Sequence, residues 1–150
     1  MKILVINGPN LNFLGIRERS VYGNQDYEYL KNMIADKGKE IGADIEVFQS
    51  NYEGGIIDRI QSSYFDGTEA IVINPGAYTH YSYAIRDALA SIVVPKVEIH
   101  ISDITKREAF RQVSVPKKCV IIRFMAEVYR DIWMQLIIVW HKLKKTVEKV

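Results

Sequence analysis

A glutamate and a histidine two positions apart are the first residues that could carry chemistry. Glu98 and His100 lie in the run KVEIHIS. Side chains two apart on a strand point to the same face, so the carboxylate and the imidazole would be neighbours. Such a carboxylate favours the charged imidazolium and fixes the orientation of the ring, which prepares a proton donor. The alternative is a core histidine paired with an acid.

An arginine and a tyrosine share a loop near the N-terminus. The apolar residues 3–6 lead into GPNLNFLGIRERSVYG, which contains Arg17 and Tyr22. Tyrosine has an ordinary pKa of about 10 and is a poor base at neutral pH, but a nearby guanidinium stabilises the phenolate. The pair could therefore form a base that assembles when the loop closes over a ligand. The alternative is a surface loop whose tyrosine packs on the domain.

Further polar residues lie just after or between the expected strands. Asn74 and His80, in NPGAYTH, could meet the hydroxyl or carboxylate groups of a small ligand, or only cap a turn. Arg107 and Arg111 are four apart, so we expect them on one face of a helical turn, either as a carboxylate clamp or as a solvated basic face. Asp87 could face solvent, pair with the arginine before it, or reach the site of a neighbouring subunit.

Alternating β-rich runs and helical stripes must position these side chains. Helices are predicted over residues 28–41, between an N-cap at Asp26 and a stop at Gly42, over a stripe from Ile56 to Tyr64, and over residues 81–91. Strands are predicted at residues 2–7, 44–49, 70–74 and 95–100, with a weaker fifth at 119–124 and an amphipathic helix from residue 128 onward. This alternation predicts a parallel sheet with its ligand crevice outside the carboxyl ends of the strands.

Composition sets limits on the class of protein. The chain has 150 residues, 48% of them hydrophobic, which suits one domain with a substantial core. Twenty Lys and Arg nearly balance 18 Asp and Glu, so bulk charge gives no case for nucleic acid or membrane as a partner. The single cysteine, Cys119, fits a reducing compartment, and no signal-peptide or membrane-spanning pattern occurs. We expect a soluble, cytoplasmic, single-domain protein.

Several common kinds of site have no motif in the chain. It contains neither a phosphate-binding P-loop nor G-x-G-x-x-G, and no G-x-S-x-G turn that would present a serine nucleophile. The three histidines lack metal-ligand spacing, so we expect no metal site. The remaining acid–base groups are Tyr, His and Arg. They suit removal of a proton next to a carbonyl, followed by loss of a leaving group.

Four longer motifs together resemble the type II 3-dehydroquinate dehydratases. The motifs are GPNLNFLGIRERSVYG, SNYEGGIID, INPGAYTHYSYAIRDAL and VEIHISDITKREAFR, and the resemblance covers residues 1 to about 114. It implies a flavodoxin-like, three-layer α/β fold with a central parallel sheet of about five strands. It also implies a lyase without a cofactor, which converts 3-dehydroquinate to 3-dehydroshikimate by trans-dehydration in the shikimate pathway, through an enolate.

The resemblance also implies a role for each matching residue. Tyr22 would remove the proton beside the ketone, and Arg17 would lower the pKa of Tyr22. Asn10 would hold the water that stabilises the enolate. His100, oriented by Glu98, would protonate the departing hydroxyl group.

The remaining positions implied by the resemblance would bind substrate. These are Asn74, His80, Ile101, Ser102 and Arg111, with Asp87 contributed by a neighbouring subunit. The family commonly forms trimers that assemble into dodecamers, so the resemblance implies a homo-oligomer of this kind.

The C-terminal part of the chain departs from the family pattern. Residues 115–150 lack the glycine-rich turn expected before the last helix, because all nine glycines lie at or before Gly76. The expected catalytic residues all precede this segment. A second hypothesis is therefore a binding protein for a small polyhydroxy carboxylic acid that has kept the pocket and lost turnover.

Overall fold

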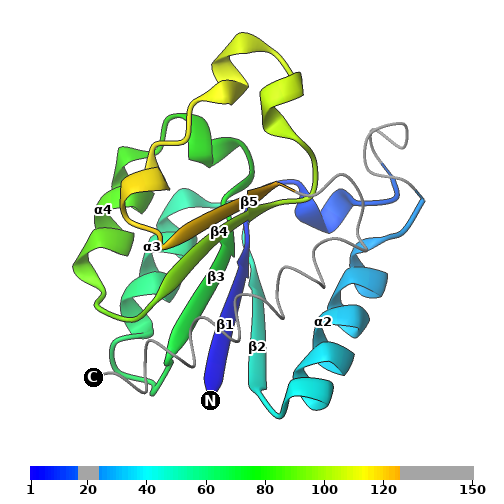
Figure 1. The fold of residues 1–150 in the computed structure, drawn as a ribbon, viewed down its shortest axis with the longest axis vertical. Helices are drawn as coiled ribbons and strands as arrows, with labels where there is room; N and C mark the ends of the chain where they lie inside the picture. Colours follow the sequence, from blue (N-terminus) through cyan, green and yellow to red (C-terminus); the bar gives the residue numbers. More distant parts are fainter. Residues whose placement is uncertain (17–23, 126–150) are drawn as a thin grey trace.

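The computed structural model describes residues 1–16 and 24–125. Five parallel strands form one sheet in the order β2-β1-β3-β4-β5 (Figure 1). The strands are β1 (Lys2–Asn7), β2 (Asp44–Gln49), β3 (Ala70–Asn74), β4 (Lys96–His100) and β5 (Ile122–Met125). The α-helices are α2 (Tyr27–Ile41), α3 (Glu53–Ser62) and α4 (Tyr83–Ser91). This strand order is that of flavodoxin, which confirms the expected fold class.

Three of the predicted strands have the bounds that the sequence indicated, and two differ. β4 begins at Lys96, one residue after the predicted start. The fifth strand was placed too early: Pro116–Lys118 form a short 3-10 helix, η5, and β5 begins only at Ile122. The physical reason is local, because a proline at the first position of a helical turn has its φ already set for that turn.

Capping residues define two of the helices. The Asp26 carboxylate accepts a 2.7 Å hydrogen bond from the Tyr29 amide at the start of α2, and Gly42 ends the helix with φ 67°, as predicted. α4 begins at Tyr83, two residues later than expected, because the Ser82 hydroxyl caps it by accepting from the Ile85 amide at 2.9 Å. The predicted stripe that included Tyr64 was wrong at that residue, which lies beyond α3 and is 68% exposed.

The helices cover the sheet on both faces, α2 on one and α3 with α4 on the other (Figure 1). Leu30 and Ile34 of α2 pack against one face of the strands, while Ile60 of α3 and Leu89 of α4 pack against the other. The helix expected from residue 128 onward lies outside the described residues, and the single-domain organisation over residues 1–150 stays a prediction. Within residues 1–16 and 24–125, no helix is both long and apolar enough to cross a membrane.

Strand β4, which lies between β3 and β5, carries different side chains on its two faces. Val97 and Ile99 belong to the apolar core beneath α2. Because side chains alternate along a strand, Glu98 and His100 point to the opposite face. Both are buried, with Glu98 fully excluded from solvent. The strand thus delivers an acid and a base together to one end of the sheet.

Candidate active site

A cleft of about 670 Å³, a volume that includes space open to solvent, lies beyond the carboxyl ends of β1, β3 and β4. Parallel α/β sheets bind ligands at this edge, where the strand order reverses. The segment that follows β4 arches above this end of the sheet (Figure 1). Seven of the predicted site residues line the cleft: Asn10, Asn74, His80, His100, Ile101, Ser102 and Arg111.

The loops after β1 and β3 pack closely together at the floor of the cleft. Gly8 donates its amide to the Asn74 carbonyl at 2.7 Å, and a Cβ at Gly8 would lie 2.5 Å from the Pro75 carbonyl oxygen. Only glycine fits there without displacement of backbone. Asn10 has φ 66°, and its amide donates to Asn51 Oδ1 at 2.9 Å. These backbone contacts fix the position from which Asn10 enters the cleft.

Glu98 and His100 form a buried hydrogen-bonded pair at the end of β4. His100 Nε2 lies 2.7 Å from Glu98 Oε1, which leaves Nδ1 as the ring nitrogen that can serve a ligand. Burial opposes ionisation of Glu98, but hydrogen bonds from His100, Thr79 and Ser114 outweigh it and hold the pKa of Glu98 below its ordinary value. The carboxylate is therefore ionised, and its hydrogen bond holds the His100 ring in a fixed orientation. This geometry suits a group that delivers a proton to a ligand in the cleft.

Two residues that support this pair were missed in the sequence. The Thr79 hydroxyl donates to Glu98 Oε1, and the Ser114 hydroxyl donates to Oε2 at 2.7 Å. Hydroxyl donors have no characteristic spacing, so no pattern singled them out. A general rule could have found them, because a buried carboxylate needs hydrogen-bond donors. Thr79, next to the histidine of NPGAYTH, and Ser114, directly after FRQV, are hydroxyl residues that could donate.

His80 lines the cleft from the end of the short 3-10 helix η2 (Gly76–His80), which follows β3. Its Nδ1 lies 2.8 Å from the Val113 carbonyl oxygen, which can only accept, so Nδ1 carries the hydrogen. Burial is the main cause that lowers the pKa of His80, and the nearby His100 and Arg111 lower it further. A neutral His80 therefore offers Nε2 as an acceptor for a ligand hydroxyl.

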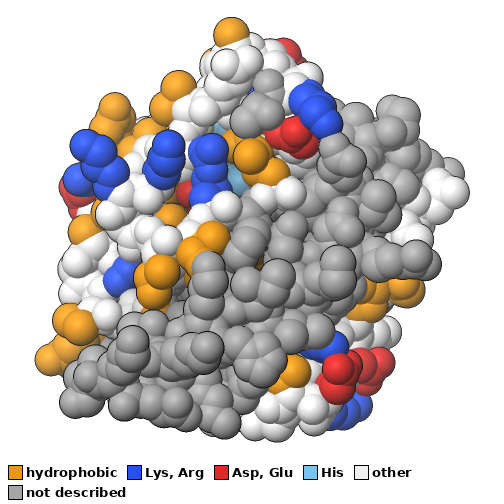
Figure 2. Space-filling view, in the orientation of Figure 1, with side chains coloured by type: hydrophobic (Ala, Val, Ile, Leu, Met, Phe, Trp, Pro, Cys, Tyr) orange, Lys and Arg blue, Asp and Glu red, His pale blue; other side chains and the backbone are white. Residues whose placement is uncertain are grey.

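Arg107 and Arg111 both line the cleft, but the predicted shared helical turn was wrong. Arg111 lies in the short 3-10 helix η4 (Ala109–Gln112), whereas Arg107 lies before it, where the chain bends after η3 (Ile104–Lys106). Arg111 Nε donates to Glu108 Oε2 at 2.8 Å. In the upper half of Figure 2, lysine and arginine side chains lie on the described surface next to acidic side chains, with a histidine visible among them. The cleft thus has a cationic wall suited to a carboxylate.

Four predicted site residues are not among the described residues that line the cleft. Asp87 lies on α4, where its side chain is 70% exposed and pairs with Arg86 at 2.6 Å. Arg17 and Tyr22 lie outside the described residues. Glu98, a fourth, stands behind His100 and acts through it.

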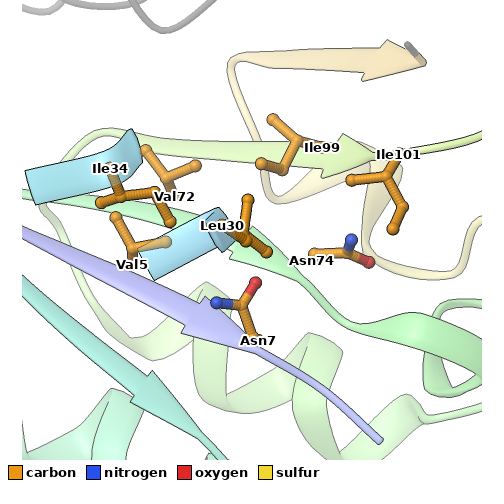
Figure 3. Close-up of a pocket in the computed structure, with 8 residues that line it drawn as sticks. All are labelled: Val5, Asn7, Leu30, Ile34, Val72, Asn74, Ile99 and Ile101. Atoms are coloured by element: carbon orange, nitrogen blue, oxygen red, sulfur yellow. The ribbon is translucent and has the colours of Figure 1, made fainter. Parts of the chain in front are cut away.

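A second pocket lies on the α2 face of the sheet (Figure 3). Its described lining is made of apolar side chains from β1, β3, β4 and α2 together with two asparagines: Val5, Asn7, Leu30, Ile34, Val72, Asn74, Ile99 and Ile101. None of these side chains titrates, so this pocket does not suit acid–base chemistry. The described residues also contain no group of three or more His, Cys, Asp or Glu that could hold a metal ion.

The fold and the cleft define a flavodoxin-like α/β protein with an acid–base site for a small anionic ligand. Comparison with known proteins is consistent with this description. The model of the dehydroquinase class II family matches residues 1–130. A 3-dehydroquinate dehydratase of Lachnoclostridium phytofermentans is 68% identical over 115 residues, which are 77% of this chain and 79% of the relative. A second, from Lachnospira eligens, is 64% identical over 116 residues, with the same coverage of 77% and 79%.

Solved structures agree. The crystal structure of a type II dehydroquinase from Butyrivibrio crossotus superposes with a TM-score of 0.89 at 55% sequence identity, and the match covers 92% of this chain and 96% of that one. This chain belongs to the class II dehydroquinase family.

Proposed function

We propose that this protein catalyses the trans-dehydration of 3-dehydroquinate to 3-dehydroshikimate in the shikimate pathway, without a cofactor. Family membership supports the reaction, and the named relatives are 3-dehydroquinate dehydratases. The observation that carries the proposal is the buried His100–Glu98 pair at 2.7 Å in a cleft with a cationic wall. Loss of a hydroxyl group requires a proton donor, and this pair provides one.

The described cleft residues divide between chemistry and binding. His100 protonates the departing hydroxyl group, and Asn10 holds the water that stabilises the enolate. Arg111 binds the carboxylate, while Asn74 and His80 bind hydroxyl groups of the substrate. The backbone around Ile101 and Ser102 completes the binding surface. Support comes from their common position along the cleft and, for His80, from the free acceptor nitrogen.

The base and its activator belong to the N-terminal loop. Tyr22 removes the proton beside the ketone, and Arg17 stabilises the phenolate. This assignment rests on the motif resemblance and on the chemistry of a tyrosine beside a guanidinium. The cleft residues supply an acid and an enolate-stabilising amide, so a base is the remaining part that the reaction needs.

We further propose a homo-oligomeric, cytoplasmic enzyme, with trimers that assemble into dodecamers. The position of Asp87 supports this arrangement, because its exposed carboxylate on α4 is available to a neighbouring subunit. Asp87 would then complete the neighbour's site.

The test of function is the ultraviolet absorbance of purified protein mixed with 3-dehydroquinate. The dehydrated product is a conjugated enone, so turnover raises the absorbance. Folded protein that binds the substrate and gives no rise would contradict the enzyme and favour the alternative, a binding protein for a small polyhydroxy carboxylic acid. The relatives named above are dehydratases or dehydroquinases by name, and none is named as a binding protein.

Replacing Arg111 with alanine is expected to raise KM by about 10- to 100-fold and to leave kcat nearly unchanged, because a hydrogen bond to a charged group contributes roughly 1.5–3 kcal/mol. Arg111→Lys should recover part of the loss, since lysine keeps the charge without the two-pronged geometry. Steady-state kinetics measures both constants.

The matched control is Lys106→Ala. Lys106 lies on the same segment between β4 and β5 as Arg111, does not line the cleft, and pairs with Asp103 at 3.4 Å. Replacing it with alanine removes one positive charge, as Arg111→Ala does. An unchanged KM in Arg111→Ala, or an equal rise in both variants, would remove the carboxylate role from Arg111.

A further inference from the structure

The segment that arches above the cleft, residues 101–121, contains three consecutive residues that form hydrogen bonds around the Glu98–His100 pair. The Val113 carbonyl accepts from His80 Nδ1 at 2.8 Å, the Ser114 hydroxyl donates to Glu98 Oε2 at 2.7 Å, and the Val115 amide donates to the Thr79 carbonyl at 2.8 Å. We call residues 113–115 the strap. It connects the segment after η4 both to the turn after β3 and to β4.

Ser114 occupies the critical position of the strap. Glu98 is fully buried, and each of its oxygens needs a donor. In the described part of the chain, Oε1 receives hydrogen bonds from Thr79 and His100, and Oε2 receives one from Ser114. Removal of the Ser114 hydroxyl would leave a buried carboxylate oxygen short of a donor, and the carboxylate would turn toward another partner.

The strap is also directly connected in sequence to the cationic wall of the cleft, which contains Arg111. It directly follows η4, which carries Arg111, and it is followed by the buried Pro116. Arg111 and His100 both line the cleft, whereas Ser114 does not. The same segment therefore sets the position of Arg111, which would bind the substrate carboxylate, and the orientation of the Glu98 carboxylate, which contacts His100.

We propose that Ser114 is a positioning residue for the dehydration: through Glu98 it holds the His100 ring in the orientation that delivers a proton, and the strap couples this orientation to the wall that carries Arg111. The role rests on the proposed function. Because Ser114 acts behind His100 and outside the cleft, its loss affects the chemical step rather than the binding of substrate.

Ser114→Ala is therefore expected to lower kcat by on the order of tenfold or more, since a hydrogen bond to a charged group is lost, with KM close to that of the wild type. Ser114→Thr keeps the hydroxyl and should restore kcat. The control is Ser63→Ala, because the Ser63 hydroxyl is buried and also donates a hydrogen bond, at 2.5 Å to a backbone carbonyl in α3, away from the cleft. That variant should retain both constants.

Two outcomes would overturn the proposal. One is a wild-type kcat in Ser114→Ala; the other is a rise in KM alone, as expected for Arg111→Ala, which would assign Ser114 to the binding wall. If Ser114→Ala does not fold, Ser114→Cys takes its place, because cysteine is close in size and a weak donor. Full kcat in folded Ser114→Cys would then contradict the proposal.

A crystal structure of the Ser114 variant separates this inference from the proposed function. Positioning predicts that the Glu98 carboxylate rotates and that the 2.7 Å contact to His100 Nε2 is lost, whether or not the wild type is an active dehydratase. An inactive wild type with this displacement would contradict the function and keep the positioning role. An active wild type with an unmoved pair in the variant would contradict the positioning role alone.

Discussion

The Tyr22→Phe variant is expected to lose turnover by about 10²–10⁴-fold while it still binds substrate, because this is the usual contribution of a general base. Phenylalanine keeps the ring and removes only the hydroxyl group that would accept the proton. The His100–Glu98 pair remains in place, so the variant retains its acid and its binding wall. The assay is the enone absorbance, with substrate affinity measured separately by calorimetry.

Tyr52→Phe provides the matched control. Tyr52 is 79% exposed just before α3 and does not line the cleft, so loss of its hydroxyl should leave kcat unchanged. Full activity in Tyr22→Phe would refute Tyr22 as the base. A protein that only binds its ligand would behave alike in both variants and give no absorbance rise in either.

Glu98→Gln is expected to lower kcat by on the order of 10²-fold or more, since it disables His100, the proposed general acid. Two effects combine. The amide has no negative charge, so it no longer forms the charge-assisted hydrogen bond that orients the His100 ring. Its NH2 group also cannot accept the hydrogen bonds that Thr79, His100 and Ser114 now donate to the two carboxylate oxygens. KM should change little, because Glu98 does not line the cleft.

The control for this change is Glu53→Gln. Glu53 also accepts a hydroxyl hydrogen bond, from Ser82 at 2.5 Å, but it lies at the start of α3 and outside the cleft. Thermal melting of both variants shows whether either change disturbs folding. If folded Glu98→Gln keeps the wild-type kcat, the histidine does not depend on its carboxylate, and another group must donate the proton.

The interior of the sheet was the most predictable part of the fold. β1 and β3 are short apolar runs that end in polar residues, and every residue of β3 is buried. A run buried on both faces has one simple interpretation, a central strand of a parallel sheet. The Glu98–His100 pair was predictable for a similar reason, since the two-residue period of a strand places both side chains on one face whatever the rest of the chain does.

Relations between distant segments could not be predicted in this way. Ser114 meets Glu98 across 16 positions, and no local period links a serine to a carboxylate. The spacing of Arg107 and Arg111 suggested a helix, but the chain bends between η3 and η4, and the two arginines reach the cleft from different elements. The start of β5 moved because Pro116 begins a helical turn first. In each case tertiary contacts or a turn overrode the local pattern.

The alternation of side chains along β4 makes catalysis a measure of correct folding. Glu98 pairs with Ile73 of β3 and with Arg123 of β5 in the parallel ladder. If β4 shifted by one residue, Glu98 and His100 would turn toward the apolar core beneath α2, and Ile99 would take their face. Such a chain would keep its sheet and much of its circular dichroism spectrum but would lack the proposed proton donor. In a refolding experiment, the circular dichroism signal would report all molecules that have formed a sheet. The recovered enzymatic activity would report only those molecules in which β4 has its native register.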